Sequence, residues 1–242
     1  MLRSIFYSVL LIFVSAASGQ DVALTSVMRS QYVYGNGNPL HDKPVIQTDL
    51  CLSFSNGLWA DVWGSVPCDL ADTGKDYGTE LYLTAGWAKT VGSYHVSLGV
   101  GYDDLYHADR FEGSDWGTVI FEASKDFHPL RSFAISPFVH IETYFIFDGS
   151  VIGDTFPRLG SYYSLKLSEI ARLEGKGYLL YDPGILSNKA MLMGDLDTSV
   201  HWKSGKNSVL EFPYFRVIAP LTTAYGGRKF EAIWGAGITV KF

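Results

Sequence analysis

Apolar and polar residues alternate along most of this chain, in segments of about ten residues or more. The clearest segment is the last one, residues 229–242, where every second residue is apolar: Phe230, Ala232, Trp234, Ala236, Ile238, Val240 and Phe242. The other positions are mostly small or charged, and Ile233 is the one apolar exception. Successive side chains of a β-strand point to opposite faces. We therefore expect a strand with one apolar and one polar face.

Twelve segments of this kind follow one another and are separated by turn residues. They cover residues 22–34, 44–54, 58–66, 78–89, 94–103, 115–125, 133–147, 159–168, 176–181, 191–203, 208–219 and 229–242. About ten residues cross a bilayer as a tilted strand. The pattern predicts an all-β fold, a transmembrane antiparallel up-and-down β-barrel of twelve strands. The ninth segment is short and glycine-rich, and without its hairpin the barrel has ten strands.

The connections between these segments alternate in length. The longer ones cover residues 35–43, 67–77, 104–114, 148–158, 182–190 and 220–228, and the shorter ones include 55–57, 90–93, 126–132 and 204–207. Outer-membrane barrels have short periplasmic turns and longer outer loops. The tract 211–216 around Pro213 interrupts the alternation, which indicates a β-bulge.

The amino-terminal residues have the pattern of a secretory signal peptide. A short basic start precedes the apolar run 5–14 and the small residues 15–19, so we expect cleavage within 17–20, with a signal peptide over 1–19 and a barrel domain over 20–242. The cleavage region has no cysteine for a lipid anchor. No run of about 18 apolar residues follows, which excludes a membrane-spanning helix.

The last strand resembles the signal by which bacterial outer-membrane barrels are recognised for assembly. Its candidate signal residues are Trp234, Ile238, Val240 and the carboxy-terminal Phe242. The predicted location is therefore the bacterial outer membrane, reached through the periplasm. The expected partners are the lipid bilayer, the barrel assembly machinery and small polar solutes, and the oligomeric state stays open.

Composition agrees with a barrel and excludes other classes. Loss of Arg3 with the signal peptide leaves 18 basic against 25 acidic residues, a formal charge of −7, and no basic patch suggests nucleic acid. Aromatic residues make up 15% of the chain, enough for two interfacial girdles. We expect Trp87, Tyr94 and Trp202 near the periplasmic edge, and Tyr102 and Trp116 near the outer edge.

Alternation also assigns side chains to the lumen. The candidate lumen-lining residues are Asp49, Glu80, Asp103, Glu122, His140, Glu142, Lys166, Asp195, Asp197, His201 and Glu231. With Glu211 included, the inward acids outnumber the inward lysines 166, 176, 203 and 241. Two interpretations follow: a narrow channel that favours cations or polar neutral solutes, or a closed lumen in which these charges pair across strands.

Several segments resemble the TorF-type porin family of small outer-membrane barrels. The match includes the hairpin from Ser53 to Ser65 with its Asn-Gly turn and Trp-Gly-Ser ending, the segment Lys43 to Gln47, and the triplet at 80–82. Residues 34–37 depart from the family pattern, in which an Arg-Gly pair follows the aromatic of the first strand. The resemblance implies a porin-like barrel and supplies no catalytic residue.

Enzymatic, metal and disulfide chemistry have weaker signals. His95 and Ser97 have the spacing of a hydrolase pair, but both are expected to point inward near the periplasmic end, far from outer-leaflet lipid. No ligand spacing indicates a metal, the acidic loop 69–76 lacks the pattern of a calcium loop, and no cofactor is expected. Cys51 and Cys68 either pair or remain free thiols.

These features together predict a non-enzymatic, porin-like channel for passive diffusion of small polar solutes, with a bias towards cations. The alternative is a closed structural or adhesive barrel whose outer loops bind partners. A third class is a lipid-modifying enzyme.

Overall fold

The computed structural model describes residues 20–33, 39–41, 43–68, 79–106, 116–146, 154–183, 191–222 and 230–242. The described residues form strands joined by turns. The strands are β1 (Gln20–Arg29), β2 (Tyr32–Val33), β3 (Pro39–His41), β4 (Val45–Phe54), β5 (Leu58–Pro67), β6 (Thr79–Val91), β7 (Tyr94–Tyr106), β8 (Trp116–Lys125), β9 (Phe127–Leu130), β10 (Phe133–Ile146), β11 (Asp154–Lys166), β12 (Ala171–Asp182), β13 (Met191–Lys203), β14 (Ser208–Pro220) and β15 (Glu231–Lys241).

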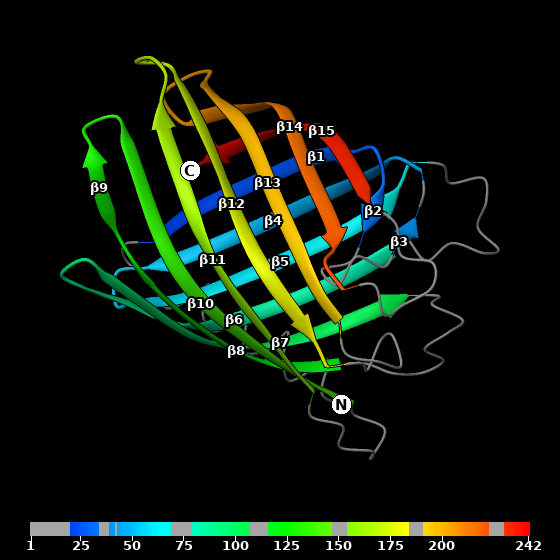
Figure 1. Ribbon diagram of the computed structural model, residues 1–242. Coiled ribbons are helices and arrows are strands. Elements are labelled where there is room, and N and C mark those ends of the chain that lie inside the picture. Colours follow the sequence, from blue (N-terminus) through cyan, green and yellow to red (C-terminus); the bar gives the residue numbers. More distant parts are fainter. Residues whose placement is uncertain are drawn as a thin grey trace.

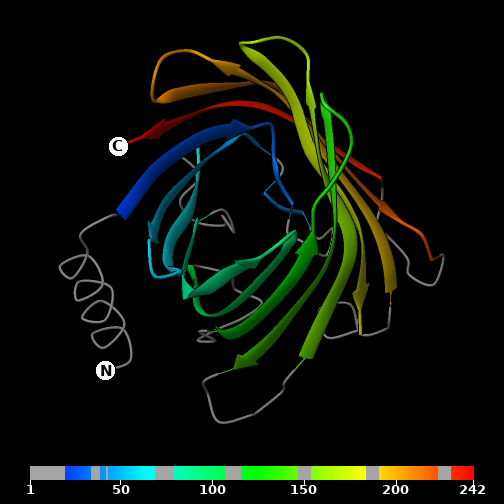
Figure 2. The same cartoon turned by 90° about the vertical axis from the view of Figure 1, so that its left-hand side faces the viewer.

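Twelve of these strands form a closed antiparallel barrel, as predicted (Figures 1 and 2). Neighbouring strands pair in chain order, and β15 pairs with β1 to close the ring. Thr25, for example, lies opposite Thr239 on one side and Asp49 on the other. The predicted ninth strand is β12, which is 12 residues long, so the ten-strand alternative is wrong. Closure removes the free edges that β1 and β15 would otherwise expose.

Three local features extend or refine the predicted strands. The expected connector 126–132 is mostly a continuation of the hairpin, because β9 pairs with β10 and leaves only Arg131 and Ser132 as the turn. Strand β11 begins at Asp154, five residues before its predicted start. The bulge expected around Pro213 is confirmed by a register shift between Glu211 and Tyr214.

The outer wall of the barrel is apolar around its circumference. Exposed fractions are 50% for Leu98, 62% for Leu159, 52% for Phe215 and 60% for Trp234. The same face includes Leu24, Met28, Ile46, Val66, Val100, Val119, Val139, Leu179, Leu196, Leu210 and Ile238. An exposed apolar surface of this extent is typical of contact with lipid.

Part of the expected aromatic distribution is wrong. Trp87, Tyr94 and Trp202 are exposed on the outer wall. Trp116, placed by the sequence near the outer girdle, lies opposite Asp103 and is 7% exposed inside the barrel. Tyr102 is also buried. Alternation fixes opposite faces within a strand but does not say which face is outward when both contain aromatic residues.

The two ends of the barrel differ in their connections. One end, called here the short-turn end, has the turns 55–57, 92–93, 131–132, 167–170 and 204–207. Gly57 and Gly92 occupy positive φ there, at 89° and 63°. At the opposite end, called here the long-connector end, the described residues stop at 33, 68, 106, 146, 183 and 222 and resume at 39, 79, 116, 154, 191 and 230. The acidic loop 69–76 lies outside the described residues.

Two further sequence-based expectations concern the ends and the cysteines. The predicted signal peptide lies outside the described residues, and β1 begins at Gln20. No helix in the described part of the chain is long and apolar enough to span a membrane. Cys51 lies opposite Asp61 as expected, and both Cys51 and Cys68 are free thiols, so the disulfide alternative is wrong.

Candidate functional site: the barrel lumen

The lumen contains a cavity of about 650 Å³, called here the chamber. Its size falls within the roughly 300–1,000 Å³ typical of small-molecule sites. Its wall consists of inward-facing side chains from most of the barrel strands and from β2. The polar lining residues include Arg29, Gln47, Asp61, Glu80, Thr84, Ser97, Asp103, Glu122, His140, Glu142, Arg158, Lys176, Asp197 and Arg216, with Trp59, Trp63 and Tyr82 among the aromatic ones.

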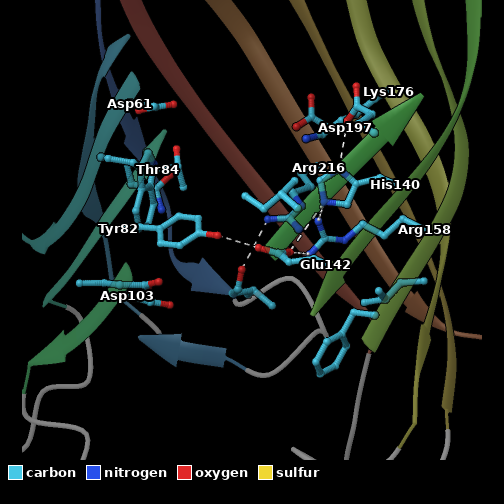
Figure 3. A pocket seen from close by; sticks show the side chains of 18 of the residues that line it. Asp61, Tyr82, Thr84, Asp103, His140, Glu142, Arg158, Lys176, Asp197 and Arg216 are labelled. Atoms are coloured by element: carbon cyan, nitrogen blue, oxygen red, sulfur yellow. Dashed lines mark hydrogen bonds and ion pairs between the residues drawn. The ribbon is translucent and has the colours of Figure 1, made fainter. Parts of the chain in front are cut away.

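Charges of opposite sign lie on opposite walls of the chamber. Figure 3 shows Asp61 and Asp103 on one wall and Arg158, Lys176 and Arg216 on the facing wall. Among the described residues, every Arg or Lys that lines the chamber comes from β1, β11, β12 or β14, whereas the charged residues that β5–β7 contribute are all acids. The chamber therefore has an acidic side and a side that contains all its strong cations.

Many of the charges on the basic side are paired. Arg158 Nη2 donates to Glu142 Oε2 at 2.9 Å, and its Nη1 donates to His140 Nε2 at 3.0 Å. His140 Nδ1 lies 3.0 Å from Glu122 Oε2. Tyr82 on the acidic side donates its hydroxyl to Glu142 Oε1 at 2.8 Å (Figure 3). This network satisfies buried charges by charge-assisted hydrogen bonds and joins β6 to β10 and β11.

Arg216 is held by a second buried pair. Its Nε and Nη2 donate to the Asp195 carboxylate at 3.1 and 2.6 Å, and the Asp195 side chain is only 2% exposed. Tyr178 also donates to Asp195, at 2.6 Å. Arg29 contacts Glu211 at 3.4 Å and stacks over the Tyr214 ring. Each of these two arginines is therefore engaged by an acid of the barrel wall, Arg216 by Asp195 and Arg29 by Glu211.

Asp61 and Lys176 at the chamber wall have neither an ion-pair partner nor a tyrosine donor among the described residues, whereas Glu80 and Asp197, also outside ion pairs, accept from Tyr32 and Tyr214. Asp61, on β5, is the diagonal neighbour of Asp49 in the pairing of β4 with β5, and its Oδ1 has no donor. Lys176, on β12, lies opposite Asp197 in the register, but the two groups are not within ion-pair distance. The Lys176 ammonium is 5.9 Å from the Tyr178 ring centroid.

The long-connector end of the lumen is filled by apolar side chains, called here the apolar plug. Its members are Val33, Trp116, Tyr144, Phe156, Leu180, Met191, Met193, Tyr214, Ile218 and Ile233. All except Val33 come from inward faces of barrel strands. Val33 comes from β2, which lies inside the ring of strands (Figure 2). This packing accounts for Ile233, the one apolar residue on the inward face of β15.

Strand β2 is fixed to both walls of the lumen. The Tyr32 hydroxyl donates to Glu80, and the Tyr32 ring lies 5.8 Å from that of Trp63. The Val33 carbonyl accepts from Arg216 Nη1 at 3.4 Å. Tyr32 and Val33 are 7% and 1% exposed. Tyr32 and Val33 thus lie inside the lumen and occlude the chamber at the long-connector end.

A second cavity of about 460 Å³ lies next to the chamber. It is lined by residues such as Ser136, Glu174 and His201, which lie nearer the short-turn end. Four residues line both cavities: Arg29, Lys176, Asp197 and Tyr214. We call these four the neck. The chamber and the second cavity therefore adjoin at the neck.

The structure brings together part of the candidate set. Glu80, Asp103, Glu122, His140, Glu142 and Asp197 line the chamber, and His201 lines the second cavity. Glu80 and Asp103 are 5% and 2% exposed beside β2. Asp49 and Asp195 also face inward but do not line the chamber; they lie next to Asp61 and Arg216, respectively. Lys166 pairs with the turn residue Glu169 at 2.6 Å, and Glu231 accepts from Gln31 at 2.9 Å; neither lines the chamber or the second cavity.

Sequence reasoning missed three lumen arginines, Arg29, Arg158 and Arg216. Arg158 was assigned to a connector because β11 begins earlier than expected, and Arg216 lies just after the bulge. Cross-strand register identifies them, because each lies opposite another inward-facing residue. Arg158, for example, lies opposite His140.

His95 and Ser97 do not form a nucleophile and base. His95 Nε2 lies 2.7 Å from Asp126 Oδ2, and its Nδ1 lies 2.9 Å from the Thr90 hydroxyl, so both ring nitrogens are engaged. Hydrogen bonds from Ser136 and His95 hold the pKa of the Asp126 carboxyl, in the break between β8 and β9, below its ordinary value. The geometry indicates a hydrogen-bonded rim.

The candidate assembly residues lie on the outer face of β15. Trp234, Ile238 and Phe242 are 60%, 41% and 73% exposed, and Val240 is half-buried on the same face. The Phe242 amide donates to the Val22 carbonyl at 2.9 Å, which anchors the carboxy-terminus to β1. An apolar row is thus available on the strand that closes the barrel.

Comparison with known families decides the relationship of this chain. The family described as "Bacterial protein of unknown function (Gcw_chp)" matches residues 14–149, which is more than half of the sequence. The chain belongs to this family. No curated protein matches it.

Solved structures of outer-membrane proteins share the fold. The KdgM porin in complex with disordered oligogalacturonate is similar with a TM-score of 0.56 and 8% identity, over 92% of this chain and 99% of that chain. An outer membrane channel from Pseudomonas putida F1 gives 0.54 and 10%, over 94% and 97%. The NanC porin gives 0.53 and 12%, over 91% and 100%. At these identities the likeness concerns the fold.

Proposed function

We propose that this member of the Gcw_chp family is a TorF-type, porin-like channel of the bacterial outer membrane, through which small polar solutes diffuse passively. The observation that carries the proposal is the polar chamber, enclosed by a barrel whose outer wall is apolar. A barrel needed only as a rigid structural element could fill its lumen with side chains. Here about 650 Å³ remains open and is lined by charged groups.

The proposed location rests on the outer wall and on the last strand. The apolar belt suits the bilayer, and the exposed row on β15 suits recognition by the barrel assembly machinery. The short-turn end would then face the periplasm and the long-connector end the outside. A signal peptide over residues 1–19 supplies export to the periplasm.

The charge balance supports at most a weak preference for cations. The chamber is lined by six carboxyl groups, from Asp61, Glu80, Asp103, Glu122, Glu142 and Asp197, and by four strong cations, from Arg29, Arg158, Lys176 and Arg216. A count that includes only lysines as inward cations overstates the excess of acid, because the arginines offset most of it. We expect a cation-to-anion permeability ratio only modestly above one.

Passage across the whole barrel requires displacement of β2. The apolar plug and the hydrogen bonds of Tyr32 and Val33 occlude the long-connector end, so we propose that the resting state conducts poorly. The same occlusion is the observation that favours the second candidate function, a closed barrel that presents its long connections to partners.

Planar-bilayer recording of the purified full-length protein separates the two candidates. We expect small or infrequent conductance steps for the wild type, larger or more frequent steps for a Tyr32→Gly/Val33→Gly variant, and a reversal potential in a salt gradient on the cation side. Absence of steps from both proteins rejects the channel and supports the closed barrel, and an anionic reversal potential rejects the cation preference.

The enzymatic class has its own test. We propose that the protein is not an enzyme, because His95 is engaged by Asp126 and Thr90 and its ring lacks a free nitrogen for Ser97. Ser97→Ala protein reconstituted in phospholipid vesicles should show the same lipid composition over time as the wild type. Lipid turnover that depends on Ser97 would reject this view.

A further inference from the structure

We propose that the chamber binds zwitterionic solutes, molecules with an ammonium and a carboxylate group, between Asp61 on one wall and Lys176 on the other. The inference rests on the proposed lumenal function and names the solute class for it. Its basis is the arrangement of the charged groups at the chamber wall that have no ion-pair partner.

Most chamber charges are already neutralised or shielded. Arg158 binds Glu142 and His140, Glu122 contacts His140, and Arg216 binds the Asp195 carboxylate outside the cavity lining. A charge held by a good partner gives little additional energy to a solute, because desolvating the pair costs what a new contact returns. These groups shape the chamber but leave few attachment points.

The acids beside β2 are also poorly accessible. Glu80 and Asp103 are 5% and 2% exposed, and Glu80 accepts the Tyr32 hydroxyl. Asp61 is more accessible, because it is half-buried at the chamber wall. Asp49 is its diagonal neighbour on the same face of the sheet, so an ammonium group at Asp61 would also lie near a second acid.

The wall around Asp61 suits a cation for a second, independent reason. Trp59 and Trp63, on the same strand and the same face, both line the chamber. Indole rings attract ammonium groups through the negative face of the ring. The two indoles therefore add to the acidic side a lining that favours an ammonium group over a carboxylate.

The opposite wall offers a cation without an ion-pair partner. Lys176 lines both the chamber and the second cavity, so its ammonium is at the neck, where a solute from the short-turn side enters. Figure 3 shows Lys176 and Asp61 on facing walls. A solute with one positive and one negative group can contact both, whereas an amine or an acid alone can contact only one.

Binding in detergent micelles tests this without flux. The probes are 4-aminobutyrate, butylamine and butyrate, titrated calorimetrically into the full-length barrel, whose folding is verified by heat-modifiable gel mobility. We expect 4-aminobutyrate to bind at least tenfold more tightly than either singly charged probe. Asp61→Asn should remove at least tenfold of that affinity without weakening butyrate, and Lys176→Met should do so without weakening butylamine.

Two control variants keep the result interpretable. Lys206→Met removes an exposed lysine in the turn 204–207, outside both cavities, and should leave all three affinities within twofold, and Lys176→Arg should retain most of the zwitterion affinity. Equal affinity for the three probes, or no binding to the folded wild type, overturns the inference. Conductance without zwitterion preference rejects this inference alone, while binding without conductance rejects only the channel.

Discussion

Removing the Arg216 side chain should destabilise the barrel strongly, because its loss leaves a buried charge without its partner. In Arg216→Met, the Asp195 carboxylate, 2% exposed, loses donors at 3.1 and 2.6 Å and keeps only the Tyr178 hydroxyl. Breaking a buried ion pair on one side typically costs about 3–5 kcal/mol. The Val33 carbonyl also loses its contact with Arg216, so the variant should have a loosened β2.

The double variant Asp195→Asn/Arg216→Met separates the lost pair from the stranded charge. The Asn side chain is neutral and still accepts from Tyr178, so we expect stability within about 1 kcal/mol of the wild type. Urea unfolding from phospholipid vesicles, followed by tryptophan fluorescence, measures both variants under one protocol. Equal losses in the single and double variants, or a loss below about 1 kcal/mol in the single variant, would refute the reasoning.

Three further predictions concern packing, the plug and pH. An alanine Cβ at Gly99 would lie 2.8 Å from the Trp59 ring, so Gly99→Ala should lower the unfolding free energy by about 1–3 kcal/mol. At Gly177 the nearest atom to such a Cβ is 3.4 Å away, so Gly177→Ala should be nearly neutral in the same urea titration. Tyr32→Phe removes the hydroxyl that Glu80 accepts and should raise the frequency of conductance steps; an unchanged frequency would argue against β2 as the occluding element. The pKa of Asp126 is lower in the folded barrel than the ordinary value of about 4 for an Asp carboxyl. Its contribution to stability is therefore present above about pH 4 and is lost as the pH falls through the folded value. Asp126→Asn should therefore reduce the difference in unfolding midpoint between pH 7 and pH 3, and an unaltered difference contradicts the assignment.

Residue alternation was sufficient to predict the wall of the barrel. Strand β13 begins and ends at the predicted residues 191 and 203, and the inward positions of Glu80, Glu122 and Glu142 follow from a period of two. Successive strands pair with their chain neighbours, and the length of each connection limits where the next strand can begin. Local pattern and global topology therefore carry the same information in this fold.

The contents of the lumen depend on contacts between distant strands. Tyr32 and Val33 were read as the end of the first strand, and only packing against Trp63, Glu80 and the plug shows that β2 turns inward. Arg216 and Asp195 lie on adjacent strands but become partners only through the register beyond the bulge. A charge count along single strands cannot show such pairings.

The sequence by itself determined a twelve-stranded barrel, its apolar outer wall and the inward position of its acids, because the period of two and the connection lengths are local properties. The tertiary structure alone decided which charges neutralise one another, that β2 occludes one end, and that Asp61 and Lys176 remain opposed across the chamber. These features depend on the curvature of a closed sheet, which brings side chains from remote strands into one small volume.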